Sequence, residues 1–238
     1  LYAILHILNT PLVNITTIED PIEYEFSRVN QTQVNVKSGI TFANGLRALL
    51  RQNPDIIMIG EIRDNETVEI AVHAALTGHL VLSSLHTNDA PSALPRLLDM
   101  GAPAFLLSST VNLVIAQRLV RRICTSCTES YTASPEIMRL IKAQIALLGD
   151  TVGNIPATLY RGRGCKVCGN SGFHGQIGIF ELFRITEAVR ELILREAPVS
   201  EVRRKAIEEG MTTMFEDGLN KVEKGITTIE EILRVVSE

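Results

Sequence analysis

The sequence predicts an α/β fold in which a largely parallel sheet is covered by helices, followed by a metal-binding segment and a small helical region. Three observations lead to this prediction. Short apolar segments alternate with amphipathic segments of helical period up to about residue 120. One of the short segments is a continuous apolar run, which is typical of a parallel strand buried on both faces. Beyond residue 122, two cysteine pairs and a series of short amphipathic segments replace the alternation.

The predicted strands differ in character, which indicates how each is buried. VNITTI (13–18) is short and rich in β-branched residues, which favour strands. QTQVNV (31–36) alternates in polarity, so we expect a half-exposed strand. DIIMI (55–59) is a continuous apolar run, so we expect a strand buried on both faces. LVLSSL (80–85) is expected to be another buried strand.

The predicted helices are recognised by an apolar face and by their ends. One begins close to Pro91 and stops at Gly101, and another stops at Gly78, because glycine is favoured just past a helix end. The helical ranges are 1–8, 42–51, 66–76 and 91–100, then an insert at 135–148, and from about residue 186 the segments EAVRELIL, VSEVRRKAIEEG, TTMFEDGLNKVEKG and TIEEILRVV.

The composition narrows the class of protein. The 238 residues are 45% hydrophobic and carry a net charge of −4, so no overall positive field attracts nucleic acid or an anionic membrane. Apolar stretches are too short for a transmembrane helix. The first residues have neither a basic leader nor a small-residue cleavage site, so we expect no signal peptide. Since the first residue is not Met, we expect the chain to be part of a longer one.

The four cysteines predict a zinc site. Cys124 and Cys127 form one C-x-x-C pair, and Cys165 and Cys168 form a second. Two such pairs supply the four tetrahedral ligands that Zn²⁺ prefers, and this spacing is more typical of metal binding than of disulfides. Four thiolates close the coordination sphere, so we expect a structural zinc rather than a catalytic one; free thiols are the alternative.

Ionisable residues follow three of the predicted strands. Glu19 and Asp20 come after the first, Glu61 after DIIMIG, and His86 after LVLSSL. Ligands of open parallel sheets bind beyond the carboxyl ends of the strands, so these side chains predict a site that orients water or holds Mg²⁺. The alternative is that they are helix caps or exposed loop acids. His79 precedes LVLSSL, at the opposite end of that strand from His86. Three roles are open for it: a ligand of the site, a side chain bonded to a nearby backbone carbonyl, or a contact to an adjacent subunit.

Three arginines are candidates for neutralising phosphate charge. Arg47 and Arg51 share one helical face, opposite the apolar stripe, and Arg63 lies within GEIRD. A solvated basic face is the alternative.

Several motifs, in order, resemble the ATPases of type II secretion and type IV pilus assembly. They are ITTIEDPIEY (an aspartate box), LRALLRQNPDIIMIGEIRD (a Walker B region), TGHLVLSSLHTNDA (a histidine box), AQRLVRRICTSC with GCKVCGNSGF (a tetracysteine module) and GIFELF. The resemblance covers nearly the whole chain. It implies a RecA-like ATPase core at 1–122, a tetracysteine zinc subdomain at 123–180 and a C-terminal helical region at 181–238.

The resemblance also implies activity, partners and place in the cell. Such proteins are hexameric ATPases that lie in the cytoplasm at the inner membrane, held there through partners. They act on an inner-membrane platform protein to assemble pili or secretion pseudopili. We therefore expect ATP, Mg²⁺ and structural Zn²⁺ as cofactors and no nucleic acid. Which of the machines this chain would serve stays open.

Residue roles carry over motif by motif. Glu61 matches the Walker B glutamate that polarises the attacking water, and Glu19 and Glu23 match acids near Mg²⁺. His79 and His86 match the paired histidines, and the four cysteines match the zinc ligands. We therefore assign Glu61, Glu19 and His86 as catalytic. The remaining nucleotide-site candidates are Asp20, Glu23, Arg47, Arg51, Arg63 and His79.

The sequence departs from the family pattern at two places. The family has a G-x-x-x-x-G-K-[ST] loop directly before the helix that opens this chain, and no Gly-Lys dipeptide occurs here. Because that loop cradles the phosphates, we expect these residues alone to bind ATP weakly and not to hydrolyse it. HGQIG (174–178) stands where the family often has Gly-Arg. The alternatives are an inactive or truncated paralogue, or a zinc-stabilised nucleic-acid-binding module, which the acidic charge and 5% aromatic content disfavour.

Overall fold

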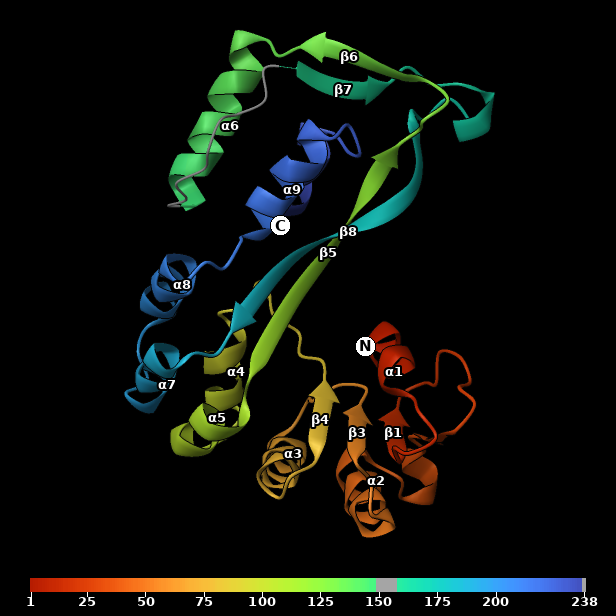
Figure 1. The fold of residues 1–238 in the computed structure, drawn as a ribbon, viewed down its shortest axis with the longest axis vertical. Coiled ribbons are helices and arrows are strands. Elements are labelled where there is room, and N and C mark those ends of the chain that lie inside the picture. Colours follow the sequence, from red (N-terminus) through yellow and green to blue (C-terminus); the bar gives the residue numbers. More distant parts are fainter. Residues whose placement is uncertain (149–157, 237–238) are drawn as a thin grey trace. The chain divides into compact units, whose positions relative to one another are not determined.

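The computed structural model describes residues 1–148 and 158–236, which form two compact units (Figure 1). The first unit contains 1–113 and 184–205, and the second contains the described residues of 114–183 and 206–238. The division of the sequence at 122 and 180 remains an expectation, and its last two segments include residues 149–157 and 237–238, which lie outside the described residues.

A four-stranded parallel sheet forms the centre of the first unit and confirms the predicted fold class. Its order is β2-β1-β3-β4, with β1 at Ile15–Glu19, β2 at Val29–Gln33, β3 at Ile56–Ile59 and β4 at Leu80–Ser83. Ile15 of β1 is paired with Val29 of β2 and with Ile56 of β3, and Ile56 is paired in turn with Leu80 of β4. The carboxyl ends of all four strands therefore meet at one edge (Figure 1).

Helices cover both faces of this sheet. Helix α1 (Tyr2–Leu8) packs Leu5 against Ile15, Ile56 and Met58. Ile18 points to the other face, where a Cβ atom on Gly45 would lie 2.0 Å from its Cδ1. Gly45 belongs to α2 (Phe42–Leu49), so the absence of a side chain there allows this helix to approach β1 closely.

The other helices of the first unit are held by a helix cap and by a hydrogen bond between two of them. Asp64 caps α3, because its carboxylate accepts the N–H of Thr67 at 2.8 Å. The guanidinium of Arg190 in α7 donates to the carbonyl of Ser108 in α5, which joins two helices far apart in sequence. These helices and those that follow them are α3 (Asn65–Leu76), α4 (Ala93–Asp99), α5 (Ala104–Thr110), α7 (Glu187–Leu194) and α8 (Val199–Glu208).

Three local expectations for the first unit were wrong or incomplete. The strand expected at QTQVNV (31–36) is β2 at Val29–Gln33, and Val36 begins a 3-10 turn instead. The run LVLSSL does not form a strand buried on both faces: β4 ends at Ser83 and Leu80 is 44% exposed. The reason is that β4 is an edge strand of the sheet within the described residues, so only one of its sides is paired. Helix α5 was not predicted, because its seven residues have no capping side chain and no charge in the first or last turn.

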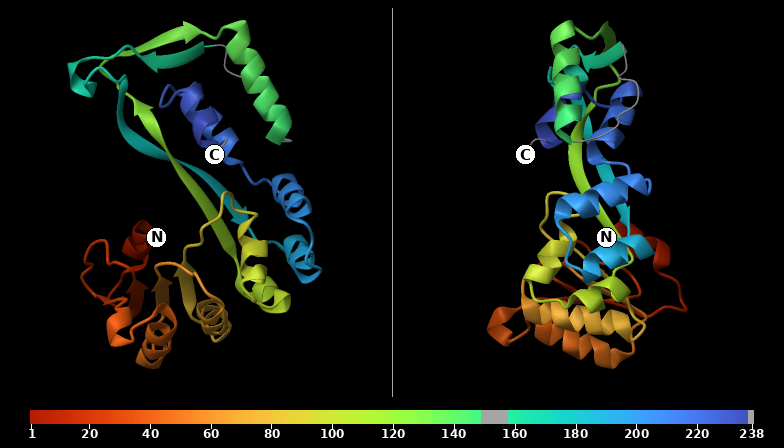
Figure 2. Two further views of the ribbon diagram at one scale, coloured as in Figure 1. Left: turned by 180° about the vertical axis from the view of Figure 1, so that it is seen from behind. Right: turned by 90° about the vertical axis from the view of Figure 1, so that its left-hand side faces the viewer.

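The second unit contains strands that the sequence analysis missed. β5 (Leu113–Ile123) pairs with β8 (Phe173–Arg184), and both are visible side by side in Figure 1 and Figure 2. β6 (Thr128–Thr132) pairs antiparallel with β7 (Thr158–Gly162). The helices are α6 (Pro135–Leu148), α9 (Met214–Glu223) and α10 (Ile229–Val236), close to the predicted positions.

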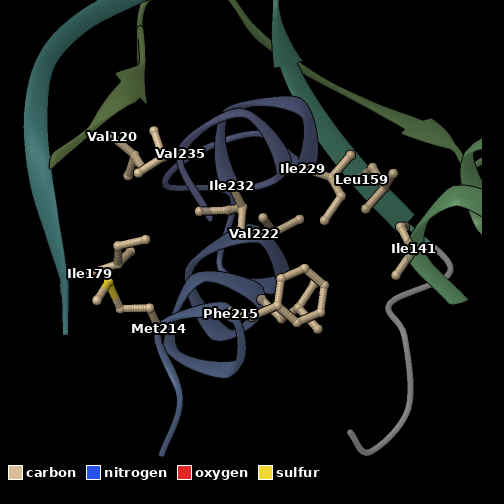
Figure 3. Close-up of a cluster of buried hydrophobic side chains, with 11 residues drawn as sticks. Val120, Ile141, Leu159, Ile179, Met214, Phe215, Val222, Ile229, Ile232 and Val235 are labelled. Carbon is tan, nitrogen blue, oxygen red and sulfur yellow. The ribbon is translucent and has the colours of Figure 1, made fainter. Parts of the chain in front are cut away.

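One apolar core holds the second unit together (Figure 3). Phe215 of α9 and Ile232 of α10 are almost fully buried, and they belong to the same cluster as Val120 of β5 and Ile179 of β8. Full burial of each side chain contributes about 1.5–3 kcal/mol. The two helices therefore stabilise the β5–β8 pair, because a sheet of only two strands is marginally stable on its own in water.

Among the described residues, no helix combines the length and the apolar character needed to cross a bilayer.

Candidate active site and metal centre

The carboxyl edge of the parallel sheet brings five of the predicted site residues together. Glu19 is the last residue of β1, and Glu61 follows β3 after one glycine. A pocket of about 230 Å³ opens at this edge beside the first residues of α1. Its lining is Leu1, Tyr2, Glu19, Asp20, Pro21, Glu23, Met58, Gly60, Glu61, Ser84 and His86.

Gly60 allows the turn that presents Glu61. Its N–H donates to the carbonyl of Ile18 at 2.8 Å, which keeps the chain against β1 just past the end of β3. A Cβ atom on Gly60 would lie 3.3 Å from the Cα of Glu19, closer than most side chains tolerate. The tight approach places the backbones of the two acidic segments side by side.

Glu61 is held in its ionised form by two basic neighbours. Arg63 Nη2 lies 2.6 Å from Glu61 Oε1, and His86 Nε2 lies 3.0 Å from Oε2. The hydrogen bond from Arg63, followed by that from His86, lowers the pKa of Glu61 below its ordinary value despite partial burial. Both partners are largely exposed, so solvent screens these ion pairs and they add little stability. The arrangement provides a fixed, charged hydrogen-bond acceptor at the pocket.

Glu19 has a different environment. It is 3% exposed, and its Oε1 accepts the hydroxyl of Thr17 at 2.5 Å and the amide of Gln31 at 3.1 Å. Its Oε2 accepts the hydroxyl of Tyr2. These three partners are uncharged donors, so hydrogen bonds rather than ion pairs to them hold this side chain in place.

The sequence analysis did not identify Tyr2, Thr17 or Gln31. Thr17 carried a usable signal, because residues two apart on a strand point to the same face. Tyr2 and Gln31 lie 17 and 12 residues from Glu19 in the sequence, and no local sequence pattern predicts contacts over such separations. Burial, followed by the hydrogen bond to Glu19, raises the pKa of Tyr2 to about 12. The Tyr2 phenol therefore remains protonated and can donate throughout the physiological range.

The structure does not bring Arg47, Arg51 and His79 to this pocket. Arg47 pairs with Glu66 at 2.6 Å and, with His79, lines a second pocket of about 450 Å³ beside α2 and α3. Arg51 is exposed in the 3-10 turn at Leu50–Gln52. Nδ1 of His79 lies 2.9 Å from the carbonyl oxygen of Ala74, at the end of α3. A nucleotide role for these three residues stays a prediction.

The four cysteines gather at one point, as their spacing predicted. Their sulfurs all lie within 4.8 Å of one another. Cys124 Sγ is 3.9 Å from Cys165 Sγ, Cys127 Sγ is 3.9 Å from Cys168 Sγ, and Cys165 and Cys168 are separated by 3.7 Å. Zinc bonded to each sulfur at about 2.3 Å would place tetrahedral sulfurs about 3.8 Å apart, close to these three separations, so the donor set fits Zn²⁺.

Backbone contacts hold the two cysteine pairs together. The N–H of Cys124 donates to the carbonyl of Gly172 at 2.9 Å, and the N–H of Arg163 donates to the carbonyl of Cys127 at 3.0 Å. Gly164 has φ +91°, and a Cβ atom there would lie 2.8 Å from the carbonyl oxygen of Asn170. Glycine is thus required at this turn both by its conformation and by space.

Comparison with known sequences gives consistent results over the whole chain. The family described as type II/IV secretion system protein matches residues 1–234. Type II secretion system protein E of Pseudomonas aeruginosa is 51% identical over 238 residues, which are 100% of this chain and 46% of that protein. Type IV pilus assembly ATPase PilB of Thermus thermophilus is 47% identical over 232 residues, 98% of this chain and 25% of that protein.

A solved structure agrees with the fold. The crystal structure of the pilus retraction motor PilT with bound ADP is similar with a TM-score of 0.67 and 28% identity, covering 98% of this chain and 55% of PilT. The chain spans about half the length, or less, of the curated relatives described here.

Proposed function

Because the chain belongs to the type II/IV secretion system protein family, we propose that it forms part of an ATP-hydrolysing motor that powers assembly of type IV pili or of type II secretion pseudopili. The observation that carries this proposal is the convergence of Glu19, Glu61 and His86 with the first turn of α1 at one pocket. Relatives from both machines match at similar identity, 51% and 47%, so the proposal includes both.

The residues at the pocket have complementary tasks in this proposal. Glu61, kept ionised by Arg63 and His86, accepts a hydrogen bond from the attacking water and orients it. Glu19, with Asp20 and Glu23 beside it, supplies the carboxylates that would hold a Mg²⁺ ion, directly or through water. When bound, Mg²⁺ neutralises phosphate charge.

We propose that the described residues alone do not turn over ATP. The start of α1 reaches the pocket, but the 238 residues contain no Gly-Lys dipeptide and so no phosphate-binding loop of the usual pattern. The proposed zinc is structural, because four cysteines fill its coordination. Assembly into a six-membered ring, contact with an inner-membrane platform protein, and a cytoplasmic position at that membrane complete the proposal and rest on family membership.

The experiment is an ATPase assay on the full-length gene product beside Glu61→Gln. Loss of a positioned acid–base group costs typically 10²–10⁴-fold, so we expect turnover to fall by at least about 100-fold. Glu191→Gln, a change of an exposed carboxylate on α7 that lines neither of the two pockets, is the matched control and should keep normal turnover. Unchanged turnover in Glu61→Gln would show that another residue handles the water.

A further inference from the structure

Tyr2 joins three segments at the candidate active site. Its hydroxyl donates to Oε2 of Glu19 and accepts the N–H of Glu23 at 3.2 Å. Its ring stacks on Tyr24, with centroids 4.4 Å apart, and on Phe26, at 5.4 Å. One side chain in the first turn of α1 is therefore bonded to the end of β1 and to the acidic segment that follows it.

Hydrogen bonds reach both oxygens of the Glu19 carboxyl group. Thr17 and Gln31 occupy Oε1 from β1 and β2, and Tyr2 occupies Oε2 from α1. Donors on both oxygens fix the plane of the group as well as its position. Since these three donors are neutral, they orient the carboxyl group without forming an ion pair that a cation in the pocket would have to displace.

We propose that Tyr2 is a positioning residue that holds Glu19 and the backbone of Glu23 in the orientation required to bind a nucleotide's Mg²⁺ ion. The inference rests on the function proposed above and deepens it. Because Tyr2 belongs to α1, a movement of the first turn of this helix is transmitted to both acids. The stacked rings of Tyr24 and Phe26 limit the directions in which Tyr2 can move.

Tyr2→Phe separates the hydroxyl from the ring. The phenylalanine ring keeps the stack, while Oε2 of Glu19 and the N–H of Glu23 each lose a partner. Tyr24→Phe is the matched control, since it removes a hydroxyl from the same stack of rings but not one that contacts Glu19.

The first measurement is binding of Mg²⁺–ATP to the full-length protein by calorimetry, in a Glu61→Gln background that should not hydrolyse it. We expect Tyr2→Phe to weaken binding about tenfold, the size expected for one hydrogen bond to a charged group, and Tyr24→Phe to change it less than twofold. When Glu19→Gln is also present, Tyr2→Phe should have no further effect, because it acts through Glu19. Equal binding by all variants, or an additive double variant, overturns the proposal.

The second measurement needs no nucleotide. Hydrogen exchange of the peptide 20–26 should be faster in Tyr2→Phe than in Tyr24→Phe or the parent protein, because the Glu23 amide has lost its acceptor. Equal exchange rates would overturn the link between α1 and this segment. This readout separates the two proposals. If the full-length protein does not turn over ATP but exchange increases as expected in Tyr2→Phe, the motor assignment fails while the contact made by Tyr2 stands.

Discussion

A buried carboxylate in the second unit offers a quantitative test of the structure. The side chain of Glu231 in α10 is 3% exposed, and its oxygens accept from Arg121 of β5 and from Arg234 one turn along the helix. Arg121 contributes twice, through its guanidinium at 2.5 Å and its backbone N–H at 3.1 Å. We expect Glu231→Gln to destabilise the second unit, because it removes the charge that these donors surround.

The size of the effect follows from the pKa of Glu231. Burial raises this pKa, but the hydrogen bonds from Arg121 and Arg234 outweigh burial and lower it from 4.5 to about 2. At 1.36 kcal/mol per unit, a shift of about 2.5 units sets an upper bound of about 3.4 kcal/mol. Both arginines are 50% exposed, so screening reduces this to about 1–2.5 kcal/mol.

The sign of the pH dependence is also fixed. The folded-state pKa of Glu231 is depressed, so its contribution is fully present above pH 4.5 and is lost as the pH falls towards 2. The difference between Glu231→Gln and the parent protein should therefore be largest near pH 7 and shrink below pH 4.5.

The assay is hydrogen exchange of peptides from β5 and α10, with zinc kept saturating and the pH varied, supported by urea unfolding followed by circular dichroism. Glu230→Gln is the control, because this neighbouring carboxylate is exposed. A variant Glu231→Gln that unfolds like Glu230→Gln at pH 7 would refute the reasoning, as would a difference that grows on acidification.

Two further predictions concern the metal centre and the sheet. Full-length protein should contain one zinc ion per chain by elemental analysis. Cys165→Ser should lower the zinc content and speed hydrogen exchange in residues 158–172. Ser126→Ala, a change between two of the cysteines, is the control and should do neither. Gly45→Ala should destabilise the first unit by about 1–3 kcal/mol, because the new Cβ would lie 2.0 Å from Ile18 Cδ1. Adding Ile18→Val removes the Cδ1 carbon and should recover part of the lost stability, measured by thermal unfolding. A Gly45→Ala protein as stable as its parent would contradict the close approach of α2 to β1.

The sequence predicted those features that depend on local pattern. The run DIIMI formed a buried strand, and the position of Glu61 directly after it was sufficient to place that residue at the carboxyl edge. Cysteine spacing was sufficient for the metal centre, because tetrahedral coordination limits how two C-x-x-C pairs can meet.

Features that depend on distant neighbours could not be predicted. The run LVLSSL gives no sign that its strand lies at a sheet edge, since edge position depends on which other strands pair with it. In β5, the exposed alternate positions hold leucines as well as arginines. The alternation of polar and apolar residues that normally identifies a half-buried strand is therefore missing from its sequence. The donors to Glu19 come from three different elements, and only the folded chain brings them together.

The two carboxylates of the candidate site belong to separate networks. Glu61 is bonded to Arg63 and His86, while Glu19 is bonded to residues of α1, β1 and β2. Different environments give similar side chains different chemical roles. Glu61, ion-paired at the pocket, suits contact with water, and the buried Glu19, bonded only to neutral donors among its given partners, suits contact with a cation. Because Tyr2 bonds the first turn of α1 to Glu19, whereas Arg63 and His86 hold Glu61, a movement of this helix would act more directly on Glu19 than on Glu61.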